Sequence, residues 1–187
     1  MEADRAVPKT SMSVDEFLAW AVDRPGRYEL VDGDVLAMSP QKVRHAEVKG
    51  SVFLALRNAV RASGISCRAM PDGMTIRVGE RTAYEPDALV CRGPRLAGDA
   101  VEVPEPVIVV EVLSPGTRRV DTGRKFSGYF SLPSVHHYLV VNPESRVVTH
   151  HWRGPGDLVS SRIAADGELR LDPPGLDVSV ADLFSSD

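Results

Sequence analysis

The amino-acid sequence predicts a single-domain α/β protein in which helices flank a mixed β-sheet. The chain has 187 residues, which suits one domain of ordinary size. Hydrophobic residues make up 43% of it, enough to build a packed core. Segments with helical spacing of apolar residues alternate with short apolar runs typical of strands. We expect residues 1–12 to form a flexible N-terminal arm and residues 13–187 to form the domain.

The first ordered segments are predicted to be a short helix and a hairpin. Ser13 stands three residues before Glu16, the spacing of a capping box, so we expect a helix over residues 13–23. The dipeptide Asp32-Gly33 separates RYELV from DVLAM, which predicts two strands joined by a tight turn.

A longer helix is predicted from about Lys42 to Ala62, and Gly64 is expected to end it. Several of its residues fall on one stripe at helical spacing: His45, Lys49, Val52, Phe53, Leu56 and Val60.

Strand patterns dominate the centre of the chain. They are ISCRAM (65–70), MTIRV (74–78), DALVCR (87–92) and VIVVEVL (107–113), the last expected to be a central strand covered on both faces. Ser114-Pro115-Gly116 should end this strand, and a helix is predicted to begin near Asp121. HHYLVV and RVVTHHW then predict a second hairpin, followed by short strands and a final helical turn.

Two carboxylates stand where strands are predicted to meet. Glu111 lies inside VIVVEVL, where an ionised group is costly unless it is paired or binds a cation. The plain alternative is a glutamate that emerges into solvent or pairs with an arginine. Asp87 opens DALVCR after Pro86, although Pro-Asp alone is common in turns. Together the two acids would form a pocket for Mg²⁺, which prefers oxygen ligands, and the carbonyl of Val112 would supply a further oxygen.

Lys125 is the third candidate residue. Asp121 and Tyr129 lie four residues before and after it, so the three share one face of the predicted helix. Its ammonium group would hold or help to deprotonate an attacking water and offset charge in the transition state. The alternative is a surface lysine paired with Asp121.

Three segments resemble the Uma-type (Uma-two) family of restriction-endonuclease-like proteins, within the PD-(D/E)XK nuclease superfamily. They are RYELVDGDVLAMSP, YEPDALV and VIVVEVLSPGTRRVDTGRKFSGYFSLPSVHHYLVV. The resemblance spans roughly residues 13–153. It implies a restriction-endonuclease-like core, with a mixed sheet flanked by helices and a divalent metal at its acidic end.

The resemblance also implies roles for individual residues. Asp87 and Glu111 match the two motif acids, with Val112 between Glu111 and the position where the superfamily usually has lysine. That position is Leu113 here, and the Uma-type pattern moves the lysine to the next helix, which points to Lys125. Two further residues match recurring family positions. Glu29 would be a metal ligand or its neighbour, or else an exposed strand residue, and His45 would face the site or lie buried and hydrogen-bonded.

A small basic cluster lies beside the predicted site. Arg118, Arg119 and Arg124 would contact phosphates, with a solvated loop as the alternative. The pairs His136-His137 and His150-His151 do not predict chelation, because neighbours on a strand point to opposite faces. One histidine from each pair, brought together across strands, is the weak remaining zinc alternative.

The bulk composition limits the function classes. A formal net charge of -4 argues against a surface that coats nucleic acid non-specifically. Two cysteines exclude a disulfide scaffold, and no apolar run reaches the roughly 18–20 residues that span a bilayer, so we expect a cytoplasmic protein that does not contact membranes.

The favoured hypothesis is an endonuclease that hydrolyses DNA with Mg²⁺ or Mn²⁺ as cofactor. The first alternative is a non-catalytic module that binds nucleic acid or a protein partner, and the second is a hydrolase of small phosphoesters. A homodimer would suit cleavage of both strands.

Overall fold

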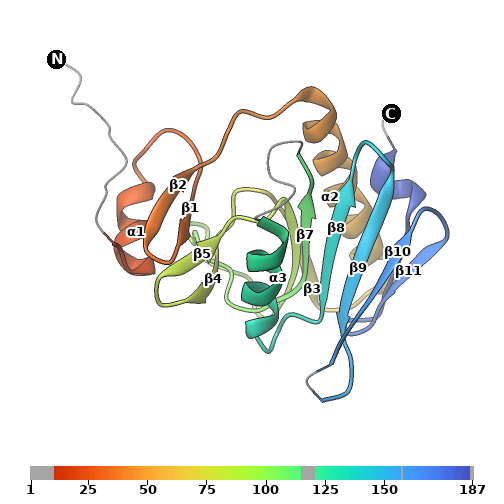
Figure 1. Ribbon diagram of the computed structural model, residues 1–187. Coiled ribbons are helices and arrows are strands. Elements are labelled where there is room, and N and C mark those ends of the chain that lie inside the picture. The colour runs from red at the N-terminus through yellow and green to blue at the C-terminus, as the bar shows by residue number, and fades with distance from the viewer. Residues whose placement is uncertain (1–10, 115–120, 157, 186–187) are drawn as a thin grey trace.

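The computed structural model describes residues 11–114, 121–156 and 158–185, and a six-stranded mixed sheet forms its centre (Figure 1). The strand order is β10-β9-β8-β7-β6-β3, and neighbours are antiparallel except for the parallel pair β7 and β8. The chain passes from β7 to β8 through a helix, as a parallel pair requires. The strands are β3 (Cys67–Pro71), β6 (Ala88–Arg92), β7 (Pro106–Val112), β8 (His137–Asn142), β9 (Val147–Arg153) and β10 (Val159–Ala164).

Helices cover both faces of this sheet (Figure 1). The helix α2 (Val43–Ser63) packs on one face, together with the two-stranded sheet of β11 (Glu168–Leu171) and β12 (Leu176–Ser179) and the 3₁₀-helix η1 (Ala181–Phe184). The helix α3 (Asp121–Ser131) packs on the other face, where Tyr129 is fully buried. The predicted mixed sheet with flanking helices is therefore confirmed.

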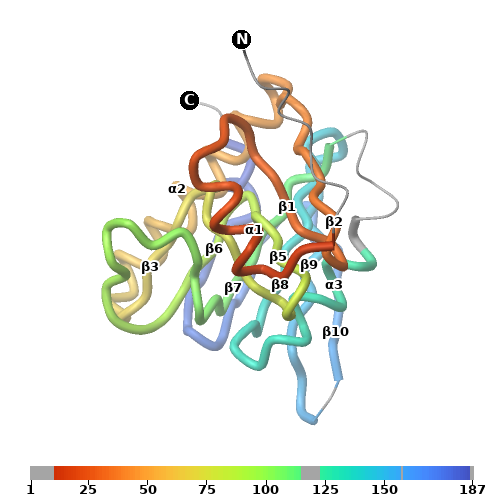
Figure 2. Tube along the Cα trace, turned by 90° about the vertical axis from the view of Figure 1, so that its left-hand side faces the viewer, coloured from red at the N-terminus to blue at the C-terminus, as the bar shows by residue number. Residues whose placement is uncertain are grey.

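A second sheet, not predicted from the sequence, stands beside the first. It has four antiparallel strands in the order β2-β1-β5-β4: β1 (Tyr28–Val31), β2 (Asp34–Ala37), β4 (Ile76–Gly79) and β5 (Thr82–Tyr84). The helix α1 (Val14–Ala21) buries Val14 and Phe17 against it, and Figure 2 shows α1 and this sheet in front of the larger sheet. The strand β5 escaped prediction because it has three residues, too few to show alternation.

Local signals explain how the first elements begin and turn. Ser13 and Glu16 form both hydrogen bonds of the predicted capping box at the start of α1. Asp32 and Gly33 have φ of 52° and 90°, the left-handed conformations that a tight hairpin turn needs. Residues 1–10 of the predicted arm lie outside the described residues. Among the residues that the structure describes, no helix is both long and apolar enough to cross a bilayer.

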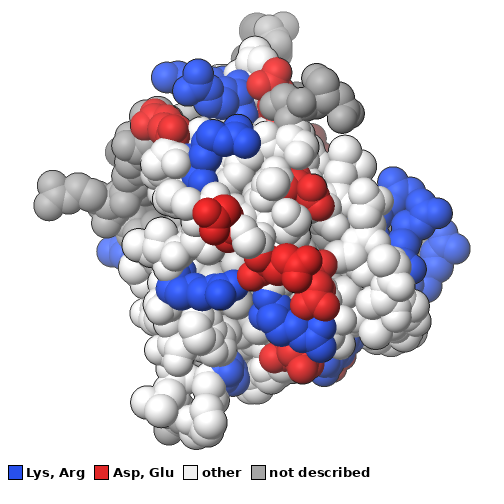
Figure 3. Space-filling model, turned by 90° about the vertical axis from the view of Figure 1, so that its right-hand side faces the viewer, with Lys and Arg blue, Asp and Glu red and all other residues white. Residues whose placement is uncertain are grey.

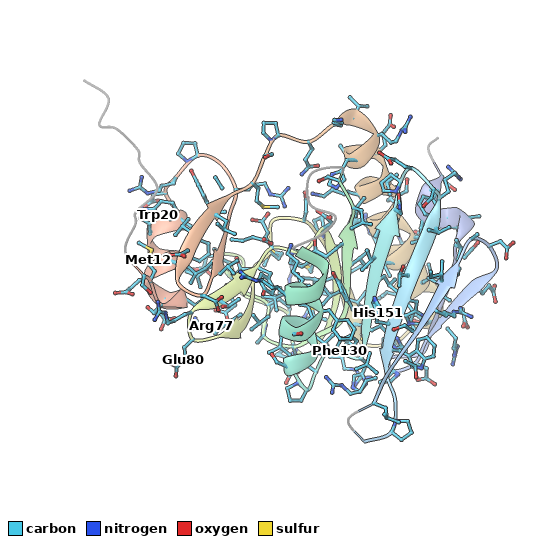
Figure 4. The ribbon with its side chains drawn as sticks, in the orientation of Figure 1. Met12, Trp20, Arg77, Glu80, Phe130 and His151 are labelled. Atoms are coloured by element: carbon cyan, nitrogen blue, oxygen red, sulfur yellow. The ribbon has the colours of Figure 1, made fainter. Side chains whose placement is uncertain are left out.

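Side chains fasten the helices to the sheets. Arg77 reaches from β4 toward α1, where its Nη2 donates to Oδ1 of Asp15 at 2.5 Å (Figure 4). Figure 4 also labels Phe130, near the end of α3, and His151, in β9 of the larger sheet. The ring of Phe126 contacts both, with centroid distances of 5.1 and 5.0 Å.

Candidate active site

Glu111 lies in β7, the buried strand between β6 and β8. Its side chain is 13% exposed and points toward α3, where Oε1 accepts hydrogen bonds from Tyr129 Oη at 2.7 Å and from Lys125 Nζ at 3.0 Å. The pKa of Glu111 is raised to about 8: burial is the largest cause, the charge of Lys125 opposes it, and the negative charges of Asp87 and Glu29 add to the rise. The three carboxyl groups therefore influence one another electrostatically.

Asp87 immediately precedes β6, at the edge of the sheet where β7 ends. Its backbone N–H donates to the Val110 carbonyl at 3.0 Å, and its Oδ2 accepts the N–H of Val112 at 2.6 Å. The side chain thus replaces a backbone acceptor where the ladder between β6 and β7 ends. The strands β6 and β7 are adjacent and antiparallel, so the start of β6 lies beside the end of β7. Asp87 and Glu111 therefore lie at the same end of these two strands.

Lys125 is buried and joins two acids. Its Nζ lies 2.9 Å from Glu29 Oε1 and 3.0 Å from Glu111 Oε1, and its residue exposure is only 3%. The ring of Tyr84 lies 5.6 Å from the same Nζ atom. The alternative of a surface lysine is therefore wrong, because α3 turns this side chain inward to the end of β7.

Glu29 brings the second sheet into the site. It lies in β1, is 7% exposed, and its Oε1 accepts the backbone N–H of Glu85 at 2.9 Å in addition to the Lys125 ammonium. The alternative of an exposed strand residue is wrong for Glu29, because β1 faces α3 and β7 at this point.

Lys49 is a site residue that the sequence analysis placed only in the helical stripe. Its Nζ lies 2.8 Å from Asp87 Oδ1 and 2.5 Å from Asp72 Oδ2, and the side chain is 6% exposed. A lysine at a buried stripe position needs a carboxylate partner, as Glu111 needs a cation. That argument predicts a buried ion pair for Lys49, but it does not identify Asp72 and Asp87 as the partners.

Arg27 extends the network beyond Asp72. Its Nη1 lies 2.7 Å from Asp72 Oδ2, and its Nε and Nη2 both contact Oε1 of Glu85. Burial raises the pKa of Glu85, with Arg27 opposing and the charges of Glu29 and Asp72 adding to the rise. Burial would also raise the pKa of Asp72, but Lys49 and Arg27 outweigh it and lower that pKa.

His45 and Val112 meet at the same end of β7. The Nε2 atom of His45 lies 2.7 Å from the carbonyl oxygen of Val112, the oxygen expected as a metal ligand. The other ring nitrogen, Nδ1, is buried and makes no hydrogen bond with the described part of the chain. His45 therefore faces the site from the first turn of α2.

The predicted basic cluster is described only in part. Arg124 is 63% exposed and its Nη1 lies 4.0 Å from Asp32 Oδ2. Arg118 and Arg119 lie outside the described residues, as does the side chain of Asp121. Figure 3 shows the side of the molecule on the right of Figure 1, where Lys and Arg side chains gather in several separate groups, with acidic side chains between them.

The histidine pairs meet across β8 and β9. His137 Nδ1 lies 2.9 Å from His150 Nε2, and both residues are buried. This is a direct hydrogen-bond distance, so the two rings pair with each other.

The donor chemistry of the site suits a hard cation. Five buried or half-buried acids, Glu29, Asp72, Glu85, Asp87 and Glu111, face three cations, Arg27, Lys49 and Lys125, an excess of two negative charges when all are ionised. Within the described ranges, no group of three or more histidine, cysteine or acidic residues is arranged to hold a metal ion as it stands. The lysines already pair with one oxygen of each acid, so a metal would bind the remaining lone pairs of Asp87 and the second carboxylate oxygen of Glu111.

Comparisons with known proteins agree with this architecture. Residues 14–182 match the model of the Uma2 family, described as "Putative restriction endonuclease". The chain is 29% identical over 177 residues to the "Uncharacterized protein slr1290" of Synechocystis sp. (strain ATCC 27184 / PCC 6803 / Kazusa), covering 94% of this chain and 92% of that protein. It also shares its fold with a crystal structure from Anabaena variabilis ATCC 29413, described as a "putative nuclease", at a TM-score of 0.72 and 17% identity, covering 92% of this chain and 97% of the other. The match to the family model spans nearly the whole chain, which therefore belongs to the Uma2 family.

Proposed function

We propose that the protein is an endonuclease that hydrolyses phosphodiester bonds in DNA with the help of Mg²⁺ or Mn²⁺. One observation carries the proposal: Asp87 and Glu111 reach the same edge of the sheet from adjacent strands, and each is paired with a buried lysine. Membership of a family described as "Putative restriction endonuclease" supports the same class of reaction.

Asp87, Glu111 and the carbonyl of Val112 are the residues that would hold the cation. Glu111 Oε2 accepts no hydrogen bond from the described residues, so it is the oxygen best placed to bind. Glu29 lies beside them through Lys125 and would act as a neighbour that adds negative charge. A divalent cation bound there would polarise the phosphate and lower the pKa of a coordinated water.

The protein residues would orient the substrate and handle the proton. Lys125 carries a buried ammonium group between two acids, and it would donate a hydrogen bond to the attacking water or to a phosphate oxygen. Tyr129 fixes Glu111 through Oε1, which leaves Oε2 in a defined direction. Lys49 holds Asp87 from the α2 side, and His45 holds the Val112 carbonyl.

The test is the nicking of supercoiled plasmid with Mg²⁺ or Mn²⁺ by the wild type and by Asp87→Asn. This variant keeps the shape of the side chain, and Asp72 still pairs with Lys49, so the fold should survive. Asp166→Asn is the matched control, because Asp166 is an exposed residue in the turn between β10 and β11 and makes no contact with the described residues of the candidate site. We expect nicking by the wild type and Asp166→Asn and a loss of at least 100-fold in Asp87→Asn. Equal nicking by all three proteins would assign the activity to a contaminant.

A second candidate is a non-catalytic module that binds nucleic acid or a partner on the same fold. It is favoured by the ion pairs themselves, since both oxygens of Asp87 have partners within the protein. Calorimetric titration with Mn²⁺ separates the two candidates. Binding that is lost in Glu111→Gln supports the enzyme, whereas no binding at millimolar metal supports the module.

A further inference from the structure

A cleft of about 450 Å³ opens beside the candidate active site, between α3 and the four-stranded sheet. This size lies in the range of sites that bind small molecules or single nucleotides. The cleft takes its walls from β1, β4 and β5 on one side and from residues 123–128 of α3 on the other.

Two lining residues of the cleft, Tyr84 and Val31, connect it to the candidate active site. Tyr84 lines the cleft, and its ring lies 5.6 Å from Lys125 Nζ. Val31 also lines it, two residues after Glu29 on the same face of β1, a separation of about 7 Å. A ligand in the cleft would therefore lie beside Tyr84 and β1, the elements that adjoin Lys125 and Glu29.

The walls combine apolar surfaces with a polar rim. Val31 and Val78 supply half-buried apolar surface of the kind that contacts a planar ring, and Tyr84, which is 4% exposed, also lines the cleft. At the rim, Arg124 Nη1 lies 4.0 Å from Asp32 Oδ2, and these side chains are 63% and 80% exposed. A donor beside an acceptor matches the edge of a nucleobase, which presents both kinds of group. The carboxylate of Asp32 would repel a second phosphate, so a base fits this rim better than a phosphate does.

We propose that the cleft binds the base of the nucleotide next to the scissile phosphate. A base inside a duplex is stacked and paired, so the substrate would be single-stranded or would have this base turned out of the helix. The inference rests on the proposed nuclease function, and it adds the strand state of the substrate and the residues that would contact it.

Gly123 offers a way to fill the cleft without disturbing the fold. It lines the cleft, and a Cβ atom built on it would meet nothing within 4 Å. Leucine has a higher helix propensity than glycine, so Gly123→Leu should preserve α3. The matched control is Gly50→Leu in α2, where a Cβ atom is equally unobstructed but lies outside the cleft.

The experiment compares a short single-stranded DNA with the same strand carrying abasic positions. Cleavage with Mn²⁺ and equilibrium binding are measured for the wild type, Gly123→Leu and Gly50→Leu. We expect the wild type and Gly50→Leu to prefer the base-bearing strand about tenfold in KM and in Kd, the scale of one stacked base. We expect Gly123→Leu to bind both strands with the weaker affinity.

The outcomes separate the inference from the proposed function. If Gly123→Leu cleaves DNA and keeps the full preference for the base-bearing strand, the base-binding cleft is overturned, whereas the proposed nuclease function is retained. Absence of cleavage, together with a binding preference that Gly123→Leu removes, would overturn the nuclease and support the cleft as a base-binding site. Absence of any preference in the wild type would overturn the cleft assignment in either case.

Discussion

Lys49 Nζ lies 2.8 Å from Asp87 Oδ1, and each of the two side chains is 6% exposed. Each of these buried ions has lost its hydration, and the ion pair with the other compensates for that loss. Asp72 contacts the same ammonium group, so Lys49 links the start of β6 to the segment between β3 and β4.

Lys49→Met should strongly destabilise the protein. It leaves the buried Asp87 carboxylate with one backbone N–H and no cation, and breaking a buried pair in this way costs about 3–5 kcal/mol. Urea unfolding would measure the change. The double variant Lys49→Met with Asp87→Asn should recover part of the loss, since it removes the stranded charge. A double variant less stable than Lys49→Met would contradict the buried-pair account.

Replacing the partners of Glu111 should move its pKa upward. Lys125 and Tyr129 both favour the ionised carboxylate, and the charge of Lys125 has the larger effect. The pKa, about 8 in the wild type, is therefore expected to rise in Tyr129→Phe and to rise further in Lys125→Met. Carbon NMR of labelled glutamate side chains in metal-free protein would follow the titration, and the reverse order would argue against the contacts seen at Oε1.

Two glycines in α3 should respond oppositely to alanine. A Cβ atom on Gly128 would lie 2.7 Å from Tyr84 Cε2, so Gly128→Ala should destabilise the protein by about 1–3 kcal/mol through overpacking. Gly123→Ala meets nothing within 4 Å and should stabilise α3 by about 0.5–1 kcal/mol. Thermal melts of the two variants provide the comparison, and equal melting temperatures would rule out the close approach of α3 to Tyr84.

The buried pair His137 and His150 should make the protein sensitive to mild acid. Burial lowers the pKa of His137 to about 4 and that of His150 to about 3, where the charge of His137 adds to the effect. Between these values and about 6.5 the unfolded chain binds protons that the folded chain does not. The free energy of unfolding should therefore fall as the pH falls from 6.5 toward 4.

His150→Gln provides the check on this pH dependence. The variant removes one of the two titrating groups, so the slope of unfolding free energy between pH 6.5 and 5 should decrease by up to one proton, about 1.4 kcal/mol per pH unit. Urea unfolding at several pH values measures the slope. An unchanged slope would show that carboxyl groups, not the histidine pair, govern acid sensitivity.

Residue patterns along the chain were enough to predict the larger elements and the position of Asp87 and Glu111 at the ends of neighbouring strands. The apolar run around Glu111 predicted a buried strand. It also indicated that Glu111 has a specific partner, because burying an unpaired carboxylate is costly. The capping box at Ser13 and the turn at Asp32-Gly33 were readable because they depend on neighbours a few residues away.

Contacts between distant segments were not readable in the same way. Glu29 and Lys125 are 96 residues apart and meet only because β1 of the second sheet docks against α3. Arg27 meets Glu85 for the same reason, and a single sequence has no periodicity that pairs them. The second sheet itself depends on β5, a three-residue strand that local propensity cannot distinguish from a loop.

Glu29 belongs to the smaller sheet, whereas Glu111 belongs to the larger one, and the Lys125 ammonium spans the seam between them. Any slippage of the sheets past each other would pull this amine away from one of its two carboxylates. The proposed base-binding cleft lies between the smaller sheet and α3, the helix that carries Lys125. A substrate bound there would contact the smaller sheet and α3 at once, so its binding would be mechanically coupled to the position of the Lys125 amine between the two carboxylates.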